Sequence, residues 1–419
     1  MLHRLQLVGA GAVLVVAAFS TGFPFLFYLV YLGILVVGGS YVLTRLGLTD
    51  LEAGYAVNAL HGHVGDELRV TYTLRNVGRL PKPWIEVHNQ TTLPSGLPGR
   101  AISLAPRSER SWLVRVPLVR RGEFEIGPLE VRTGDPFGLF EASASVGHGV
   151  NVVVYPRIDR LPLWRLPAAN LEGSHAAPER ALQTSPLATS VRPWAPGDSF
   201  NRIHWKTTAR HGSIQVKEFD LEQTADAWVF VDLERAVQAG RGDESTVEVG
   251  VRAAASIADK AIAENRAVGL TVNGHRLVVL PADRGSRQHS KIMQLLAAVE
   301  GDGTSPLAEV LVGGLSRLRR GMTAIVITPS TDRSWIRPLA AVRAKGVGCL
   351  VVWLDGHAFE VEARRLRRLP PPEPAVDEAA TTRARALLYT LAEYDLPAVT
   401  VRPGRPLGEL LVTPGGGGR

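Results

Sequence analysis

Two apolar runs near the N-terminus constrain this chain more than any other feature. Between Leu5 and Ser20, and again between Phe23 and Thr44, there is no charged side chain. Each run is close to the ~20 residues that a helix needs to cross the hydrocarbon core of a bilayer. The short segment that joins them, STGFP, is rich in turn-forming residues. We therefore expect residues 1–48 to form a transmembrane helical hairpin.

Arginine positions predict the orientation of this hairpin. Arg4 precedes the first run and Arg45 closes the second, whereas the turn carries no cation. Because cytoplasmic flanks are enriched in Lys and Arg, we expect both ends, and everything after Arg45, in the cytoplasm. A cleaved signal peptide is the alternative, since Leu5–Ala18 resembles a short signal core, but the second run would still anchor the product. The single cysteine, Cys349, allows no internal disulfide, which suits a reducing compartment.

The pattern of apolar and polar residues changes twice along the rest of the chain, which predicts a multidomain α+β protein. Residues 51–155 contain short alternating runs such as ELRVTYTLRN and SWLVRVPLV, a pattern typical of an antiparallel β-sandwich. Residues 225–405 alternate continuous apolar strands such as AWVFVDL with helical segments, which indicates a doubly wound α/β domain with a mainly parallel sheet. We expect residues 156–224 to be a linker with a distinctive motif, and residues 406–419 to be a disordered tail.

That motif, RPWAPGDSFNRIHWKTTARHG, gathers two tryptophans, a turn and several cations before an apolar strand. Asp198 is placed to cap a short helix that starts at Ser199 and ends at Gly212. On such a helix three cations lie four residues apart and form one stripe, namely Arg202, Lys206 and Arg210. Ile214–Phe219 then alternates as a strand that enters the α/β domain.

Two interpretations of this motif remain open. Trp194 and Trp205 can be packing anchors between domains, with the cations on a solvated face, because aromatic residues dominate buried interfaces. Alternatively, the combination of Trp and Arg favours a recognition surface for an acidic partner or for phosphates. The candidate partner-binding residues are Arg192, Trp194, Asp198, Arg202, Trp205, Lys206 and Arg210.

Three blocks of the sequence resemble one protein family. They are the motif above extended to RPWAPGDSFNRIHWKTTARHGSIQVKEF, VRRGEFEIGPLEVRTGDPFGLF at residues 119–140, and VVVYPRI at residues 152–158. They are similar to the family called domain of unknown function 58, whose members resemble membrane-anchored bacterial proteins with a β-rich N-terminal region and a von Willebrand factor A-like C-terminal domain. The resemblance covers nearly the whole chain. It implies a role in an assembly or chaperone-like system, with a MoxR-type AAA+ ATPase or a transglutaminase-like protein as partner.

The resemblance also implies a place where a metal ion can bind. A von Willebrand A-like domain carries Asp-x-Ser-x-Ser at the end of its first strand, with a Thr and a second Asp from later loops, a donor set that suits Mg²⁺. Asp232 stands at the first position, but Glu234 and Ala236 replace the two serines. Thr304 and Asp332 can supply the later ligands. Because both hydroxyls are missing, capping or salt-bridge roles are favoured for Asp232 and Glu234, and we expect no cofactor, with Mg²⁺ as the alternative.

The chain lacks the local motifs of several well-known catalytic sites. It contains no Gly-x-Ser-x-Gly, no Walker-type loop and no His-Glu-x-x-His. We therefore expect a membrane-tethered scaffold that docks a protein partner and has no catalytic activity of its own. A hydrolase of the cell envelope is supported by no residue of the sequence.

The net charge of +7 points to an anionic neighbour, whether phospholipid, nucleic acid or an acidic protein. Nucleic-acid binding is the alternative function, through Arg202, Lys206, Arg210 and the arginine clusters at residues 120–121, 319–320 and 364–368. The affinity would then fall steeply as salt is added. A basic domain near the membrane also gains from the anionic cytoplasmic leaflet, so the charge requires no nucleic acid, and we rank this alternative second.

Overall fold

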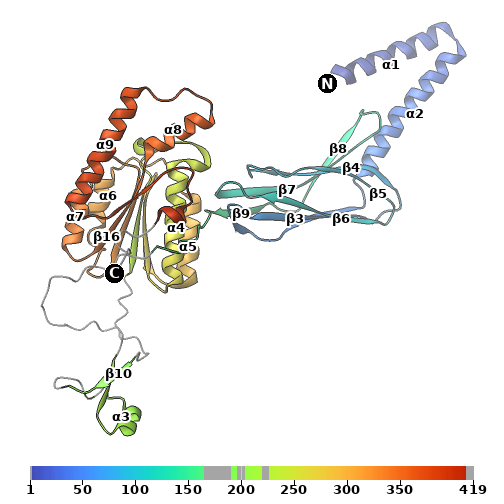
Figure 1. Ribbon diagram of the computed structural model, residues 1–419. Coiled ribbons are helices and arrows are strands. Elements are labelled where there is room, and N and C mark those ends of the chain that lie inside the picture. Colours follow the sequence, from blue (N-terminus) through green and yellow to red (C-terminus); the bar gives the residue numbers. More distant parts are fainter. Residues whose placement is uncertain (1, 165–189, 196–199, 201–202, 219–225, 412–419) are drawn as a thin grey trace. The chain divides into compact units, whose positions relative to one another are not determined.

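The computed structural model describes residues 2–164, 190–195, 200, 203–218 and 226–411. The chain divides near Arg157 into two compact units, which are described separately. The first contains two N-terminal helices and a β-rich domain, and the second contains an α/β domain (Figure 1). The fold is therefore of the mixed α and β class that the sequence indicates.

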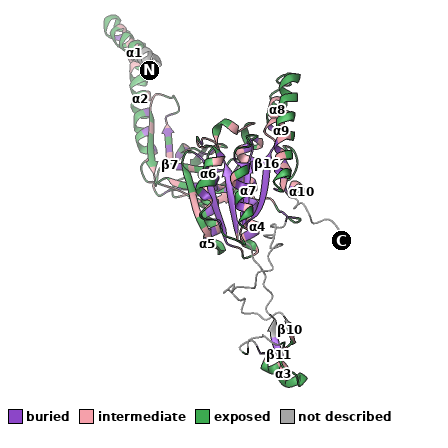
Figure 2. Ribbon diagram, turned by 90° about the vertical axis from the view of Figure 1, so that its left-hand side faces the viewer, coloured by how far each residue is buried: buried purple, intermediate pink, exposed green. Residues whose placement is uncertain are grey.

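The two N-terminal helices are α1 (Leu2–Thr21) and α2 (Pro24–Gly47). Gly22 joins them in the left-handed region, at φ +63°, where a side chain would be strained. Among the described helices, α2 alone has the length and the mean hydropathy, 2.1, of a membrane span, whereas the apolar part of α1 is limited to Gly9–Thr21. The side chains of α2 are mostly exposed (Figure 2). One apolar helix of spanning length is thus present, and the second span stays a prediction.

The β-rich domain is built from two sheets that share one core. The first sheet contains β1 (Leu51–Val57), β3 (Glu67–Asn76) and β6 (Glu109–Pro117). The second contains β2 (His61–His63), β9 (Val150–Tyr155), β7 (Gly122–Gly134), β4 (Lys82–Thr91) and β5 (Arg100–Leu104), with β8 (Glu141–Val146) paired to β7. All pairs are antiparallel except β2 with β9.

Alternation along β3 explains why this domain forms two layers. Leu68, Val70, Tyr72 and Leu74 are buried in a core that also contains residues of β4, β7 and β9, while the residues between them are more exposed. Because successive side chains of a strand point to opposite faces, the apolar set of one sheet meets that of the other. The alternating runs therefore predict the β-rich character of this region correctly.

A buried lysine connects α2 with the β-rich domain. Lys82 is 2% exposed, and its ammonium group donates hydrogen bonds to the main-chain oxygens of Leu46 and Thr49. Leu46 lies in the last turn of α2, where the unpaired carbonyl groups favour a cation. Burial lowers the pKa of Lys82, and the charge of Asp50 partly opposes that shift.

The α/β domain contains a six-stranded sheet in the order β14-β13-β12-β15-β16-β17. Its strands are β12 (Ala227–Asp232), β13 (Val268–Asn273), β14 (Leu277–Asp283), β15 (Thr323–Thr328), β16 (Gly348–Leu354) and β17 (Ala398–Val401). Only β14 is antiparallel to its neighbour. Every residue of β12, β13, β15 and β16 is buried, which is typical of parallel strands covered by helices on both faces.

Helices cover both faces of this sheet (Figure 1). α4 (Thr246–Ala263) and α5 (Gly285–Ala298) lie on one side, and α6 (Leu307–Gly314), α7 (Ile336–Ala344) and α9 (Pro374–Glu393) lie on the other. Two further helices, α8 (Gly356–Leu366) and α10 (Leu407–Leu410), are absent from the sequence prediction. α8 buries only Phe359, and α10 has only four residues, so neither gives a long repeat of buried apolar positions.

Substitution of Phe230 on β12 tests how closely the core is packed between the sheet and α6. Its side chain is 0% exposed, and a Cβ added at Gly314 would lie 2.9 Å from its ring, so α6 approaches the strand closely there. We expect Phe230→Ala to lower the free energy of unfolding by about 3–5 kcal/mol, because it leaves a cavity in a close-packed core. Chemical denaturation measures this change. Val312→Ala, at a side chain 55% exposed on α6, is the control and should change stability little.

Candidate functional site

The segment that carries the motif folds as a small hairpin with a helix inside it. We call the described residues 190–195, 200 and 203–218 the signature segment. Within it, β10 (Ser190–Pro193) pairs antiparallel with β11 (Gln215–Glu218), and α3 (Trp205–His211) lies between the two strands. Its apolar centre is small, because only Ile203 and Val216, at 4% and 2% exposed, are buried hydrophobic residues there.

The helix of the signature segment is shorter than the sequence predicts. It begins at Trp205 rather than Ser199, and its cap is His204, whose Nδ1 accepts the backbone N–H of Thr207 at 3.1 Å. Backbone pairing explains the late start, because Ile203 bridges to Val216 and the N–H of His204 donates to the main-chain oxygen of Gln215 at 2.8 Å. These bonds are incompatible with a helix through the same residues.

Two further predictions for this segment need correction. The cationic stripe on one helix is wrong, because Lys206 and Arg210 lie on α3 whereas position 202 precedes it. The predicted strand at residues 214–219 does not enter the α/β sheet, since β11 pairs with β10. The end of the helix at Gly212 is correct, and this glycine adopts φ +68°. Asp198, Ser199 and Arg202 lie outside the described residues.

Aromatic and cationic side chains are exposed on the surface of this segment. Phe200 and Trp205 are 70% and 68% exposed, and Lys206 and Arg210 are exposed as well. Trp194 is half-buried and packs against Phe200, with ring centroids 6.4 Å apart. We call Phe200, Trp205, Lys206 and Arg210 the docking surface.

Arg192 is not part of the docking surface, because its side chain bonds within the segment. This arginine is on β10, where its guanidinium donates to the main-chain oxygen of Pro193 at 3.1 Å. It therefore has a local structural contact within the signature segment. The exposed side chains of α3 and Phe200 remain the ones that can meet a partner directly.

A second polar cluster lies at the carboxyl edge of the α/β sheet. Asp232, Asn273 and Thr328 are the last residues of the neighbouring strands β12, β13 and β15. The chain order reverses between β12 and β15, since β13 lies on one side of β12 and the later strands lie on the other. In open α/β sheets, ligands bind outside the carboxyl ends of the strands at such a switch point.

Asp232 is the central group of this cluster. Its side chain is 2% exposed, and it accepts hydrogen bonds from the Thr328 hydroxyl at 2.6 Å and from the Glu234 backbone N–H at 3.1 Å. Burial raises the pKa of this carboxyl, and hydrogen bonds from Thr328, Glu234 and Asn273 oppose the rise. The bond to Glu234 caps the turn that follows β12.

The other two carboxylates of the cluster have different environments. Burial raises the pKa of Glu234, and the charges of Asp232 and Asp332 raise it further. Asp332 accepts a hydrogen bond from the Ser334 hydroxyl, which holds the pKa of that carboxyl below its usual value. The negative charges of Asp232 and Asp332 therefore repel that of Glu234. The Asp332 carboxylate itself bonds to Ser334 of the same loop.

Thr304 reaches the same edge through a tight backbone contact. Gly303 pairs with Glu234 in a short parallel bridge, and a Cβ at Gly303 would lie 2.5 Å from the main-chain oxygen of Asn273. Only glycine allows this approach. Thr304, the next residue, is exposed. The structure thus brings Asp232, Glu234 and the 303–304 loop to one edge.

The donor set fits a metal ion only in part. Oxygen donors are present, as a hard cation requires. Among the described residues, however, no three His, Cys, Asp or Glu side chains are grouped so that they could hold an ion. Ala236 supplies no ligand, and Asp332 is bonded to Ser334. The residues therefore do not form a complete ligand set, and Mg²⁺ binding stays the alternative to the expectation of no cofactor.

Sequence reasoning missed Thr328 and Asn273. Both are buried, at 0% and 1% exposed, and both bond to Asp232. The available signal was a polar residue at the end of each apolar strand, in TAIVIT and VGLTVN. That signal does not say which strand ends are neighbours, because sheet order is not local.

The raised pKa of Asp232 predicts a pH dependence of stability. A carboxyl whose folded pKa is raised binds its proton more tightly in the native state, so its contribution is largest at low pH and declines as pH rises above ~4. We expect Asp232→Asn to become more stable relative to the wild type between about pH 4 and pH 7. Urea denaturation across this range measures the difference, with Asp243→Asn at an exposed position as control. A difference that does not change with pH would contradict the prediction.

Comparison with known proteins identifies relatives of this chain. The Uncharacterized protein YeaD of Bacillus subtilis is 28% identical over 311 residues, which are 71% of this chain and 74% of that protein. The Uncharacterized protein Rv1480 of Mycobacterium tuberculosis is 30% identical over 181 residues, and the match spans 41% of this chain and 55% of that protein. The match thus covers only about half of the mycobacterial relative.

Solved structures give weaker matches. The CARDB domain of the PF1109 protein from Pyrococcus furiosus covers 25% of this chain and 92% of that domain, with 14% identity and a TM-score of 0.19. The sporulation control protein Spo0M of Bacillus subtilis covers 26% of this chain and 50% of that chain, with 10% identity and a TM-score of 0.17. TM-scores this low give no basis for an inference about the fold or the function of this chain.

A family model agrees with the motifs. The model described as protein of unknown function DUF58 matches residues 190–355, which include the signature segment and the strands that carry Asp232 and Thr328. The resemblance indicated by the sequence blocks is therefore confirmed over residues 190–355, where the chain is similar to the DUF58 family.

Proposed function

We propose that this chain is a membrane-anchored scaffold that docks a protein partner through its docking surface and has no catalytic activity of its own. The observation that carries the proposal is the exposure of Trp205 and Phe200 beside Lys206 and Arg210. Large apolar side chains in contact with water mark sites of interaction when they are grouped. Trp and cationic groups together are typical of binding hot spots.

The local fold presents this surface without a large core of its own. Because α3 has only seven residues and no buried residue, packing accounts for little of its stability. The cap by His204 and the left-handed end at Gly212 hold the helix instead. Such a helix can place an aromatic anchor and two cations against an acidic surface.

The partner proposed is an acidic face of a MoxR-type AAA+ ATPase, with a transglutaminase-like protein as the other candidate. The family resemblance supports this choice, and the charge of Lys206 and Arg210 supports an acidic counterpart. The α/β domain is proposed to be von Willebrand factor A-like. Its doubly wound sheet and the position of Asp232 at the switch point support that assignment.

The membrane anchor is proposed to be a hairpin of α1 and α2 with both ends in the cytoplasm. Arg45 in the last turn of α2 supports this orientation, and Phe19 of α1 packs edge-on against Phe27 of α2 at 5.3 Å. A signal sequence that is removed remains the alternative for α1. In that case α2 would still anchor the product.

Nucleic-acid binding receives less support. Arg364 and Arg365 form ion pairs with Glu360 and Glu362, at 3.5 and 2.8 Å, so part of that cluster is already neutralised. Arg121 is only 6% exposed and cannot contribute to an open cationic surface. A binding constant for duplex DNA that falls steeply with added salt would nevertheless revive this function.

Affinity purification of the full-length protein from its own membranes tests the docking proposal. We expect an AAA+ ATPase to co-purify and to be identified by mass spectrometry. Trp205→Ala should weaken the binding of the ATPase about thirtyfold and lower its recovery accordingly, because removal of a hot-spot tryptophan costs roughly 2 kcal/mol. Lys206→Glu with Arg210→Glu should reduce it similarly, since both changes reverse the charge of the surface.

A matched pair of substitutions controls for the change in net charge. Arg287→Glu with Lys291→Glu also reverses an exposed arginine and an exposed lysine four residues apart, but on α5. Recovery of the ATPase should be normal with this variant. Equal recovery with the native protein, the α3 variants and the α5 variant would disprove the role of the docking surface.

The anchor is tested separately by extraction. Removal of residues 2–47 should release the protein into the soluble fraction, and Leu35→Arg should lower its resistance to alkaline extraction, because an arginine at the centre of a span costs about 2.5–3.5 kcal/mol. Leu35 is 71% exposed on α2. Leu60→Arg, at an exposed position outside the helices, is the control. The N-terminal residue of the mature protein distinguishes the hairpin from a cleaved signal.

A further inference from the structure

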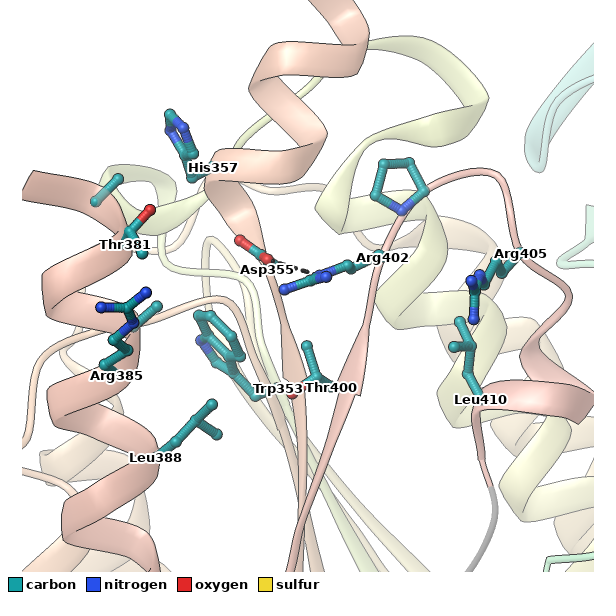
Figure 3. A pocket seen from close by; sticks show the side chains of 13 residues that line it. Trp353, Asp355, His357, Thr381, Arg385, Leu388, Thr400, Arg402, Arg405 and Leu410 are labelled. Atoms are coloured by element: carbon teal, nitrogen blue, oxygen red, sulfur yellow. Dashed lines mark hydrogen bonds and ion pairs between the residues drawn. The ribbon is translucent and has the colours of Figure 1, made fainter. Parts of the chain in front are cut away.

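The α/β domain contains a cavity that the docking surface does not involve. Its volume is about 670 Å³, which lies in the range of cavities that hold small organic ligands. Figure 3 shows that its walls come from α9 and from the segments that follow β16 and β17. Like the Asp232 cluster, it therefore lies at the carboxyl edge of the sheet, where α/β proteins bind ligands.

Three arginines line this cavity from different parts of the fold. Arg385 comes from α9, Arg402 directly follows β17, and Arg405 precedes α10. Figure 3 places Arg385 and Arg405 on opposite sides of Arg402. The three arginines come from consecutive elements of the chain, and Asp355, which follows β16, joins them in the wall of the cavity.

The positive charge of the cavity is only partly neutralised. Asp355 is its one acidic lining residue, and its carboxylate accepts a hydrogen bond from the Arg402 guanidinium at 3.0 Å. His357 also lines the cavity and is paired with Asp377. Among the described residues, neither Arg385 nor Arg405 forms an ion pair. An anion would relieve the repulsion between these cations.

Hydrogen-bond donors and apolar groups complete the walls. Thr381 lies one helical turn before Arg385 on α9, so their side chains share a face, and Thr400 lies on β17. Trp353 is 2% exposed, and its indole N–H has no hydrogen-bond partner among the described residues. Leu388, Leu410 and Pro403 supply apolar surface.

We propose that this cavity binds a soluble organic phosphate of about the size of a mononucleotide. Guanidinium groups bind phosphate oxygens through paired hydrogen bonds. The three arginines carry more positive charge than the single carboxylate of Asp355 can neutralise. The hydroxyls of Thr381 and Thr400 add donors, and the apolar wall accommodates the organic part of the ligand. This proposal is independent of the docking surface, which lies in another segment of the chain.

Isothermal titration calorimetry of the full-length protein in detergent tests the proposal. ADP, pyrophosphate and adenosine serve as probes, because they separate the phosphate from the organic part. We expect ADP to bind with a dissociation constant in the micromolar range, pyrophosphate to bind more weakly, and adenosine not to bind. Dihexanoyl phosphatidic acid is the fourth probe, and tighter binding of this lipid than of ADP would overturn the assignment to a soluble ligand.

Substitutions of two lining arginines locate the site. Arg385→Gln should weaken ADP binding at least tenfold, and Arg405→Gln should do the same. Arg383→Gln is the matched control, because Arg383 is exposed on α9 two residues before Arg385, on another face, and does not line the cavity. Circular dichroism verifies that each variant is folded.

Three further results would overturn the proposal. Absence of heat with both ADP and pyrophosphate at millimolar concentration would exclude a phosphate site. Equal weakening by Arg383→Gln and Arg385→Gln would show that binding depends on general charge and not on the cavity. Binding of pyrophosphate alone would overturn the organic part of the assignment.

Discussion

The burial of β12 between two parallel neighbours is the constraint on which the α/β domain depends. All six of its residues are buried, and it pairs with β13 on one side and β15 on the other. The same pairing brings the ends of three strands together, so that the buried carboxylate of Asp232 meets the Thr328 hydroxyl. Burial of a charged carboxylate raises the free energy of the folded state, and the hydrogen bonds to Asp232 offset part of that cost.

The signature segment depends on backbone pairing instead of on a buried core, because few of its apolar side chains are buried. Pairing between β10 and β11 keeps the chain extended until His204, which then caps a short helix. The result leaves Trp205 and Phe200 exposed next to two cations. A buried tryptophan would stabilise the segment, so its exposure is better explained by a function in binding than by a function in folding. The arginine-lined cavity, in contrast, is made from elements of the stable domain.

Much of the fold follows from patterns in the sequence. Alternation in the 67–76 run predicts a strand with one buried face, and continuous apolar runs predict the buried parallel strands, because period and burial are local properties. The apolar run at residues 24–47 likewise predicts a helix of spanning length. The end of α3 at Gly212 was predictable too, since glycine tolerates a left-handed conformation.

The sequence by itself determined the class of each region and the residue types available at the strand ends, because these depend on near neighbours along the chain. Only the tertiary structure decided which strand ends meet, so it alone joins Thr328 and Asn273 to Asp232 and turns Asp332 toward Ser334. It also decided that the helix at the motif begins at Trp205, because pairing with a strand ten residues away competes with helix formation. The position of Asp355 beside Arg402 in the wall of the cavity has the same origin, because it depends on the pairing of β16 with β17.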